Sequence, residues 1–250
     1  MRELPLFPLN TVLFPGGWLP LHIFEPRYRQ MVARCLESPE REFVVLLIKA
    51  GDEVVERPQP DAPRGTPAVP FDTGTIAQIV EARPLPDGRS FVVCHGRQRV
   101  RLGEIVQERP YLVGRVSLYP DADAGSATPA LHERAGQVRR AAERLLAALE
   151  AALPKQARDQ RAQLQALAAA FPLDATQLSC FVPRLLGGAS AEEQQVLLEA
   201  PSAQRRLELT LPLLFREQQV VEHLRALDRG APPSPGGDSP FGRIRGPSLN

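Results

Sequence analysis

The character of the chain changes near residue 120, and this change limits the folds open to it. Residues 1–120 hold ten of the fourteen aromatic residues and fifteen of the 26 prolines. Residues 121–170 hold 17 alanines in 50 positions. Aromatic and β-branched residues favour strands, whereas alanine favours helix. The sequence therefore predicts an α+β protein in which a strand-rich part over residues 1–120 precedes a helical part over residues 125–229.

The C-terminal composition, the net charge, the apolar runs and the cysteines limit the kinds of protein that this chain could be. Residues 230–250 hold five glycines and five prolines, which predicts a disordered tail. Thirty basic and 29 acidic residues leave a net charge of +1, which argues against a polyanion binder held by bulk charge. No apolar run reaches the roughly 18 residues that a membrane span requires. The three cysteines are far apart and form no CxxC, so we expect reduced thiols in a cytoplasmic protein.

The first part is predicted to form six or seven short strands and one helix. A Pro15-Gly16-Gly17 turn precedes the second strand, and Pro86-Asp87-Gly88 predicts a hairpin turn. Strands are expected over residues 3–9, 18–24, 43–48, 75–85, 90–94, 97–106 and 111–119, and a loop over 57–72. A helix should begin at Pro26, with an apolar stripe of Tyr28, Met31, Val32, Cys35 and Leu36. This pattern favours a mostly antiparallel, barrel-like sheet.

The second part is predicted to be a bundle of helices. Helices are expected over residues 131–153, 155–170, 174–187 and about 202–228, with a shorter one after Ser190. Asp174 and Ser202 are expected N-caps, and Ser190 with Glu193 forms a capping box. Pro212 should kink the last helix or end its first segment, because proline lacks the backbone donor.

Four segments carry a family resemblance. Residues 4–28 read LPLFPLNTVLFPGGWLPLHIFEPRY, residues 74–81 GTIAQIVE, and residues 96–102 GRQRVRL. Residues 193–199 read EQQVLLE, with Arg206 and Leu207 further on. Together these resemble the LON N-terminal domain, the substrate-recognition module of the ATP-dependent protease Lon, over roughly residues 3–228. The resemblance implies an antiparallel pseudobarrel related to PUA-like folds, followed by a helical bundle.

Most motif residues have structural interpretations. The prolines shape turns and keep strand edges from pairing, Gly16 permits positive φ, and Glu25 suits the positive end of the helix dipole. Arg27 and Tyr28 are expected to fasten the helix to the sheet. The motif residues expected to be structural are Pro8, Pro15, Gly16, Phe24, Glu25, Arg27, Tyr28, Gly74 and Gly96.

The sequence contains no evident catalytic or metal-binding arrangement. It has no GxxxxGK[ST] phosphate loop, and neither lysine lies in anything like the family's protease motif, so we expect neither an ATPase nor a protease. Cys94 and His95 are neighbours, but strand alternation sends them to opposite faces, which makes a poor nucleophile–base pair. The four histidines are scattered, so no metal and no cofactor are expected.

Two features are candidates for partner binding. Large aromatic side chains on a rigid sheet give much contact area, although most of these could instead belong to the core. The aromatic candidates are Phe14, Trp18, Phe71, Tyr111 and Tyr119. Period-two spacing places Arg97, Arg99 and Arg101 on one strand face, where they could meet an anion or simply pair with Glu81 or Glu104.

The leading hypothesis is a non-catalytic polypeptide-recognition module. Its partners would be unfolded or peptide segments of other proteins, and its role that of an adaptor or chaperone-like factor working with a separate protease or chaperone. The alternative is a PUA-like nucleic-acid or nucleotide binder that uses the arginine strand, which the near-zero net charge disfavours.

Overall fold

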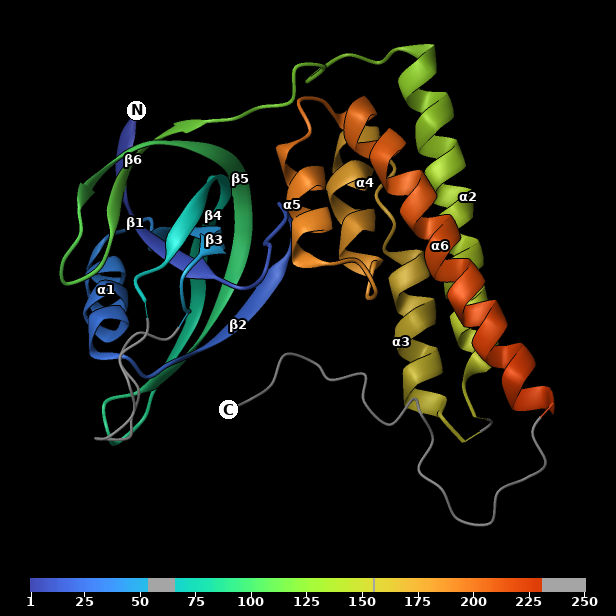
Figure 1. Ribbon diagram of the computed structural model, residues 1–250, viewed down its shortest axis with the longest axis horizontal. Helices are drawn as coiled ribbons and strands as arrows, with labels where there is room; N and C mark the ends of the chain where they lie inside the picture. The colour runs from blue at the N-terminus through green and yellow to red at the C-terminus, as the bar shows by residue number, and fades with distance from the viewer. Residues whose placement is uncertain (54–65, 155, 231–250) are drawn as a thin grey trace.

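The computed structural model describes residues 1–53, 66–154 and 156–230, with side chains as far as residue 227. Figure 1 shows a curved sheet on one side of the molecule and a group of helices on the other. Residues 231–250 of the predicted tail and residues 57–65 of the predicted loop lie outside the described residues, as does Lys155, whereas Gly230 ends the last helix.

The sheet closes into a barrel. Its strands run in the order β2-β5-β4-β3-β1-β6, and β5 also pairs with β6, which closes the ring. The β1–β3 pairing is parallel and the other described pairings are antiparallel, so the predicted barrel-like, mostly antiparallel sheet is confirmed. The strands are β1 (Arg2–Leu9), β2 (Trp18–Ile23), β3 (Glu42–Ala50), β4 (Val69–Pro84), β5 (Ser90–Gln107) and β6 (Val113–Leu118).

Strands β4 and β5 form one long hairpin. Gly88 in the turn has a φ of +81°, as expected for the Pro86-Asp87-Gly88 turn. The strands predicted over residues 90–94 and 97–106 are one continuous strand, β5. Its first part pairs with β2 and its second part with β6. Residues 69–72, expected in a loop, already belong to β4.

Both faces of the central strands are buried. Phe43 and Val45 of β3 pack toward α1 (Pro26–Glu37), whereas Val44 and Leu46 face the barrel interior. Helix α1 buries four of the five predicted stripe residues, but Leu36 is exposed, because the stripe turns away from the sheet in the last turn.

Residues of the N-terminal motif fasten α1 to the sheet. The Tyr28 ring lies against that of Phe7, with the ring centroids 4.1 Å apart. The central carbon of the Arg27 guanidinium lies over the Tyr28 ring, 4.3 Å from its centroid. Arg27 also donates to the buried carboxylate of Glu25 at 3.1 Å.

Gly74 of β4 must lack a side chain, since a Cβ there would stand 2.3 Å from the backbone oxygen of Val45.

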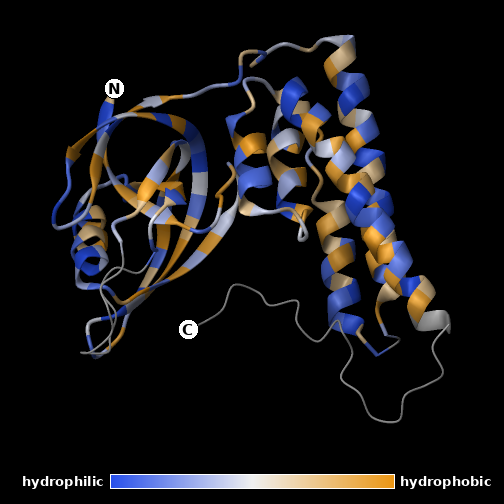
Figure 2. Ribbon diagram, viewed as in Figure 1, coloured by the Kyte–Doolittle hydropathy of each residue, from blue (hydrophilic) through white to orange (hydrophobic). Residues whose placement is uncertain are grey.

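The helical part is built around two long helices, α2 and α6, which lie side by side (Figure 1). Hydrophobic and hydrophilic positions alternate along both, as expected for helices with one buried face (Figure 2). The elements are α2 (Pro129–Ala152), α3 (Arg158–Ala169), α4 (Ala175–Phe181), the 3₁₀ turn η1 (Val182–Leu185), α5 (Ala191–Glu199) and α6 (Ala203–Gly230). The last strand of the sheet ends at Leu118, and α2 begins at Pro129. The division into a strand-rich subdomain over residues 1–120 and a helical subdomain over residues 125–229 stays a prediction.

The predicted helix caps are present. Asp174 accepts from the backbone N–H of Gln177 at 2.8 Å, and the Ser202 hydroxyl from that of Arg205 at 3.1 Å. Ser190 and Glu193 form the capping box on α5. The α-helix predicted to reach residue 187 ends at Phe181 and passes into η1, because Pro183 lacks a backbone donor.

The expectation that Pro212 ends a segment of the last helix is wrong, since α6 is assigned as one helix through it. Leu207 and Leu214, on either side of the proline, are fully buried against the other helices. This packing holds both halves of α6 although the proline removes a hydrogen bond.

A buried charge cluster joins the sheet to the helices. Arg99 of β5 and Arg206 of α6 each donate to the Asp121 carboxylate at 2.5 Å. Arg99 also donates to the backbone oxygens of Leu198 and Ala200, at 2.5 and 2.7 Å. Arg206 donates to the Ser179 hydroxyl and the Leu197 backbone oxygen. We call Arg99, Asp121 and Arg206 the junction cluster.

Replacing the shared carboxylate should loosen this junction. The change Asp121→Asn leaves two buried guanidinium groups without a counter-charge, and breaking a buried ion pair costs about 3–5 kcal/mol. Equilibrium urea unfolding should show this loss. The control Asp87→Asn removes an exposed ion pair with Arg89, for which a much smaller loss is expected because water screens it. Equal losses in the two variants would contradict a structural role for the cluster.

The capping box also predicts a pH dependence. Hydrogen bonds from Arg216 and from the Ser190 backbone lower the pKa of Glu193 to about 2. Its folded pKa lies below the unfolded value, so its contribution to stability is present above about pH 4.5 and is lost as the pH falls toward 2. The thermal midpoint of Glu193→Gln should therefore fall less than that of the wild type across this acid range. The exposed control Glu37→Gln should follow the wild-type curve, and an unchanged curve for Glu193→Gln would refute the assignment.

Candidate binding groove between the sheet and the helices

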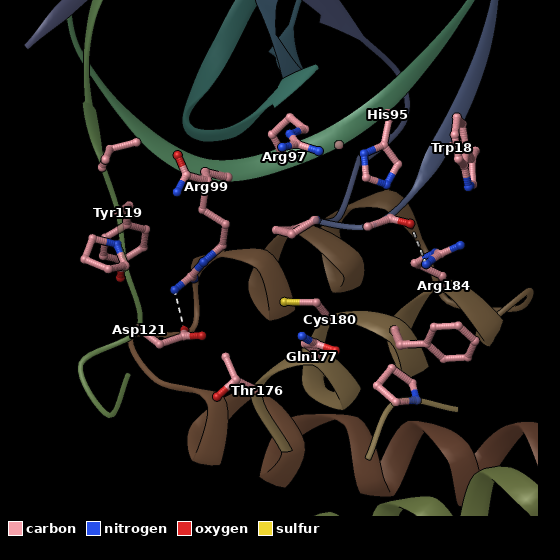
Figure 3. A pocket seen from close by; sticks show the side chains of 18 of the residues that line it. Trp18, His95, Arg97, Arg99, Tyr119, Asp121, Thr176, Gln177, Cys180 and Arg184 are labelled. Carbon is pink, nitrogen blue, oxygen red and sulfur yellow. Dashed lines mark hydrogen bonds and ion pairs between the residues drawn. The ribbon is translucent and has the colours of Figure 1, made fainter. Parts of the chain in front are cut away.

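A groove of about 950 Å³ lies between the β2–β5 side of the barrel and α4 (Figure 3). The sheet wall carries Trp18, His95, Arg97 and Arg99. Tyr119 and Asp121, from the segment after β6, close one end. The helical wall contains Leu167, Ala170, Pro172, Thr176, Gln177, Cys180, Phe181 and Arg184.

Glycines set the shape of the sheet wall. Gly16 and Gly17 are bonded to Gly96 by two backbone hydrogen bonds of 2.8 Å, and Gly16 has a φ of +75°. A Cβ on Gly96 would stand 2.4 Å from the Phe14 backbone oxygen, so a side chain there would push the turn away. The turn therefore starts β2 at Trp18, directly across from His95, and their rings lie 4.7 Å apart.

A β-bulge interrupts the predicted arginine stripe. Gly96 pairs with Ala77 and Arg99 with Thr75, so Arg97 and Gln98 both stand opposite one residue of β4. The bulge lies where β5 leaves β2 and before it meets β6. The period-two expectation therefore fails between Arg97 and Arg99, since an inserted residue shifts the alternation there. Arg99 and Arg101 keep the two-residue spacing, and both guanidinium groups lie over the Tyr119 ring.

The three arginines have three different environments. Arg97 is exposed and lines the groove. Arg99 is buried in the junction cluster, so it is not on a solvated face, and its acidic partner is Asp121 rather than Glu81 or Glu104. Burial, followed by the charge of Arg206, lowers the pKa of Arg99. Arg101 is exposed and lines a separate cavity of about 420 Å³.

The aromatic candidates are also separated. Trp18 is 58% exposed and stands at the rim of the groove, as Figure 3 shows. Tyr119 lines the groove, donates from its hydroxyl to the Glu199 backbone oxygen at 3.1 Å, and lies beneath the guanidinium groups of Arg99 and Arg101. Phe71 is half-buried in the cavity of Arg101, and Tyr111 packs on the core beside α1.

Phe14 is not a surface residue. It is 2% exposed and packs in the core of the helical part, while its neighbour Leu13 packs in the core beneath α1. Consecutive residues of the motif thus enter two different cores. Phe14 is excluded from direct contact with a partner, because the sheet and the helices cover it.

Sequence reasoning missed the helical wall. Arg184 donates to the Gly16 backbone oxygen at 2.9 Å, and its guanidinium lies 5.1 Å from the Phe181 ring centre. Gln177 is exposed on α4 beside them. The one available signal was the apolar Phe181 followed three residues later by Arg184, with Pro183 between them. Periodicity does not show which face of a short helix contacts the sheet.

Cys94 and His95 do not form a nucleophile–base pair. Burial, followed by the charge of Cys35, raises the pKa of Cys94 to about 12, and His95 points to the opposite face of β5 beside Trp18. Within the described ranges, no three His, Cys, Asp or Glu side chains gather where a metal ion could bind. None of the described helices is long and apolar enough to cross a membrane.

Comparison with known proteins gives relatives of one kind. Lon protease 2 of Myxococcus xanthus is 28% identical over 237 residues, which cover 91% of this chain and 25% of that protein. The LON peptidase N-terminal domain and RING finger protein of Schizosaccharomyces pombe is 36% identical over 100 residues, covering 40% and 20%. This chain thus spans about a quarter or less of the length of these curated relatives.

Solved structures agree with these relatives. The Lon N-terminal domain protein from Xanthomonas campestris superposes with a TM-score of 0.56 at 25% identity, covering 85% of this chain and 98% of that one. The N-terminal domain of the Mycobacterium avium complex Lon protease has the same fold, with a TM-score of 0.58 at 17% identity over the same shares. The model of the ATP-dependent protease La (LON) substrate-binding domain matches residues 3–216. This chain belongs to the LON substrate-binding domain family, whose domain is non-catalytic.

Proposed function

We propose that this chain is a non-catalytic module that binds exposed polypeptide segments of other proteins in the groove between its sheet and its helices. It would act as an adaptor or chaperone-like factor, passing these segments to a separate protease or chaperone. The family's substrate-binding role supports this proposal. The three free, buried cysteines suit the reducing cytoplasm in which such a role would be carried out.

The observation that carries the proposal is the exposure of Trp18 at the rim of a groove. An indole that is 58% exposed on a rigid strand offers a large contact area at small entropic cost. Phe181, Leu167 and Pro172 are partly exposed on the opposite wall. An extended apolar segment between the two walls would contact both, which fits the size of the groove.

The nucleic-acid alternative has less support. It required three arginines on one face, and the bulge places Arg99 inside the junction cluster. The remaining exposed pair, Arg97 and Arg101, line different cavities. A continuous phosphate backbone would lack the row of contacts that the alternative assumed.

Removing the indole should weaken peptide binding. We expect Trp18→Ala to raise the Kd for a labelled, permanently unfolded polypeptide by about tenfold or more, the effect typical of a central aromatic contact. Fluorescence anisotropy measures the change. The matched control is Phe215→Ala, which removes an aromatic side chain 43% exposed on α6 and should leave the Kd unchanged.

Thermal unfolding of both variants must accompany the titration, because the Trp18 ring also contacts His95. A Trp18→Ala protein that is as stable as the wild type and binds equally well would overturn the proposed site.

A further inference from the structure

The charges around the groove do not balance. Arg97, Arg99 and Arg184 line it, and Arg206 lies directly behind Cys180. The lining carboxylates are Asp121, which is shared by two arginines, and Glu42, which accepts from Arg2 at 2.8 Å. The junction cluster alone holds two positive charges against one negative. The lining therefore keeps a positive excess in a chain whose net charge is +1.

Two of these arginines, Arg97 and Arg184, are accessible to a ligand. Arg97 is exposed, and among the described residues it has no ion pair or hydrogen bond from its side chain. Arg184 uses one terminal nitrogen for the Gly16 oxygen and has no carboxylate partner in the part of the chain that the structure describes. Guanidinium groups hold carboxylates through two parallel hydrogen bonds, so both are suitable anchors for an acidic group.

Arg97 and Arg184 lie on either side of the Trp18–His95 ring pair. The His95 ring lies beside that of Trp18 on the sheet wall, tilted by 50° to it, with Arg97 on the same strand and Arg184 across the groove (Figure 3). Burial, followed by the charges of Arg97 and then Arg184, lowers the pKa of His95. Both cations therefore act on His95, and their charges favour its neutral form.

We propose that the groove selects polypeptide segments in which a carboxylate side chain lies next to a large apolar residue. The apolar residue would lie on Trp18, facing Phe181, and the carboxylate would bind Arg97, with Arg184 adding positive charge. This inference rests on the proposed function and names its substrate class. Walls of low dielectric strengthen such an ion pair relative to one at an open surface.

The helical wall, opposite Arg97, favours a peptide over a nucleic acid. Leu167, Ala170, Pro172 and Phe181 give it an apolar surface. A peptide with separated acidic residues can place apolar side chains there. A nucleic acid carries one phosphate on every nucleotide, and among the described residues of this wall Arg184 is the one cation that could pair with the part of its backbone desolvated there.

The test compares three labelled peptides that share one apolar core and differ at two flanking positions, which are Glu, Gln or Lys. Anisotropy titrations would use the wild type, Arg97→Gln, Arg97→Glu and the control Arg83→Gln. Arg83 is likewise an exposed strand arginine without a side-chain partner among the described residues, and it lies outside the groove lining. A single-stranded RNA is titrated in parallel.

The wild type and Arg83→Gln should bind the Glu peptide about tenfold more tightly than the Gln peptide. Arg97→Gln should remove this difference while keeping the affinity for the Gln peptide, and Arg97→Glu should reverse it in favour of the Lys peptide. A reversal cannot arise from a merely structural role of Arg97.

Four results would overturn the inference. Equal binding of the Glu and Gln peptides by the wild type would remove the acidic preference but leave the proposed function intact. An unchanged preference in Arg97→Glu would place the acidic site elsewhere. Failure of all three peptides to bind would refute the proposed function itself, and binding of RNA alone, lost in Arg97→Gln, would assign the groove to a nucleic acid.

Discussion

The structure depends on one carboxylate that two buried arginines share. Asp121 lies on the segment that leaves the barrel, while Arg99 belongs to β5 and Arg206 to α6. Each arginine also bonds backbone oxygens at the end of α5, so a strand, a linker and two helices meet at one point. A buried ion pair contributes little net stability by itself, but removing one partner is costly, which favours a single arrangement.

The N-terminal motif supplies the second attachment. Leu13 and Phe14 enter separate cores, and the Thr75 hydroxyl donates to the Leu13 backbone oxygen at 2.5 Å. The glycines that follow allow the turn to lie directly on Gly96. The residues that make the family recognisable are therefore largely structural, yet they bring Trp18 to the edge of the groove. A motif can locate a site in this way without containing the residues that bind.

Local patterns were predictable because their causes are local. The hairpin turn, the stripe on α1 and the caps at Asp174, Ser190 and Ser202 depend on residues within a few positions of each other. The misplaced residues depend on distant partners. Arg99 is buried because Asp121 and α5 reach it, and Phe14 because the helices cover it. The register shift at Arg97 and Gln98 follows from the pairing of β5 with β4, β2 and β6, which no single strand's alternation reveals.

Arginine serves both the structure and the proposed recognition because its guanidinium group is planar and has several donors. Of the 30 basic residues, all but Lys49 and Lys155 are arginines. Arg99 uses its planar fork to reach a carboxylate and two backbone oxygens at once, which a lysine ammonium could not do in one fixed geometry. The buried excess charge of the junction cluster then contributes to the potential of the groove from beneath its surface. Mobile ions screen buried charges less than exposed ones, so this contribution should depend less on ionic strength than the long-range contribution of the exposed Arg97.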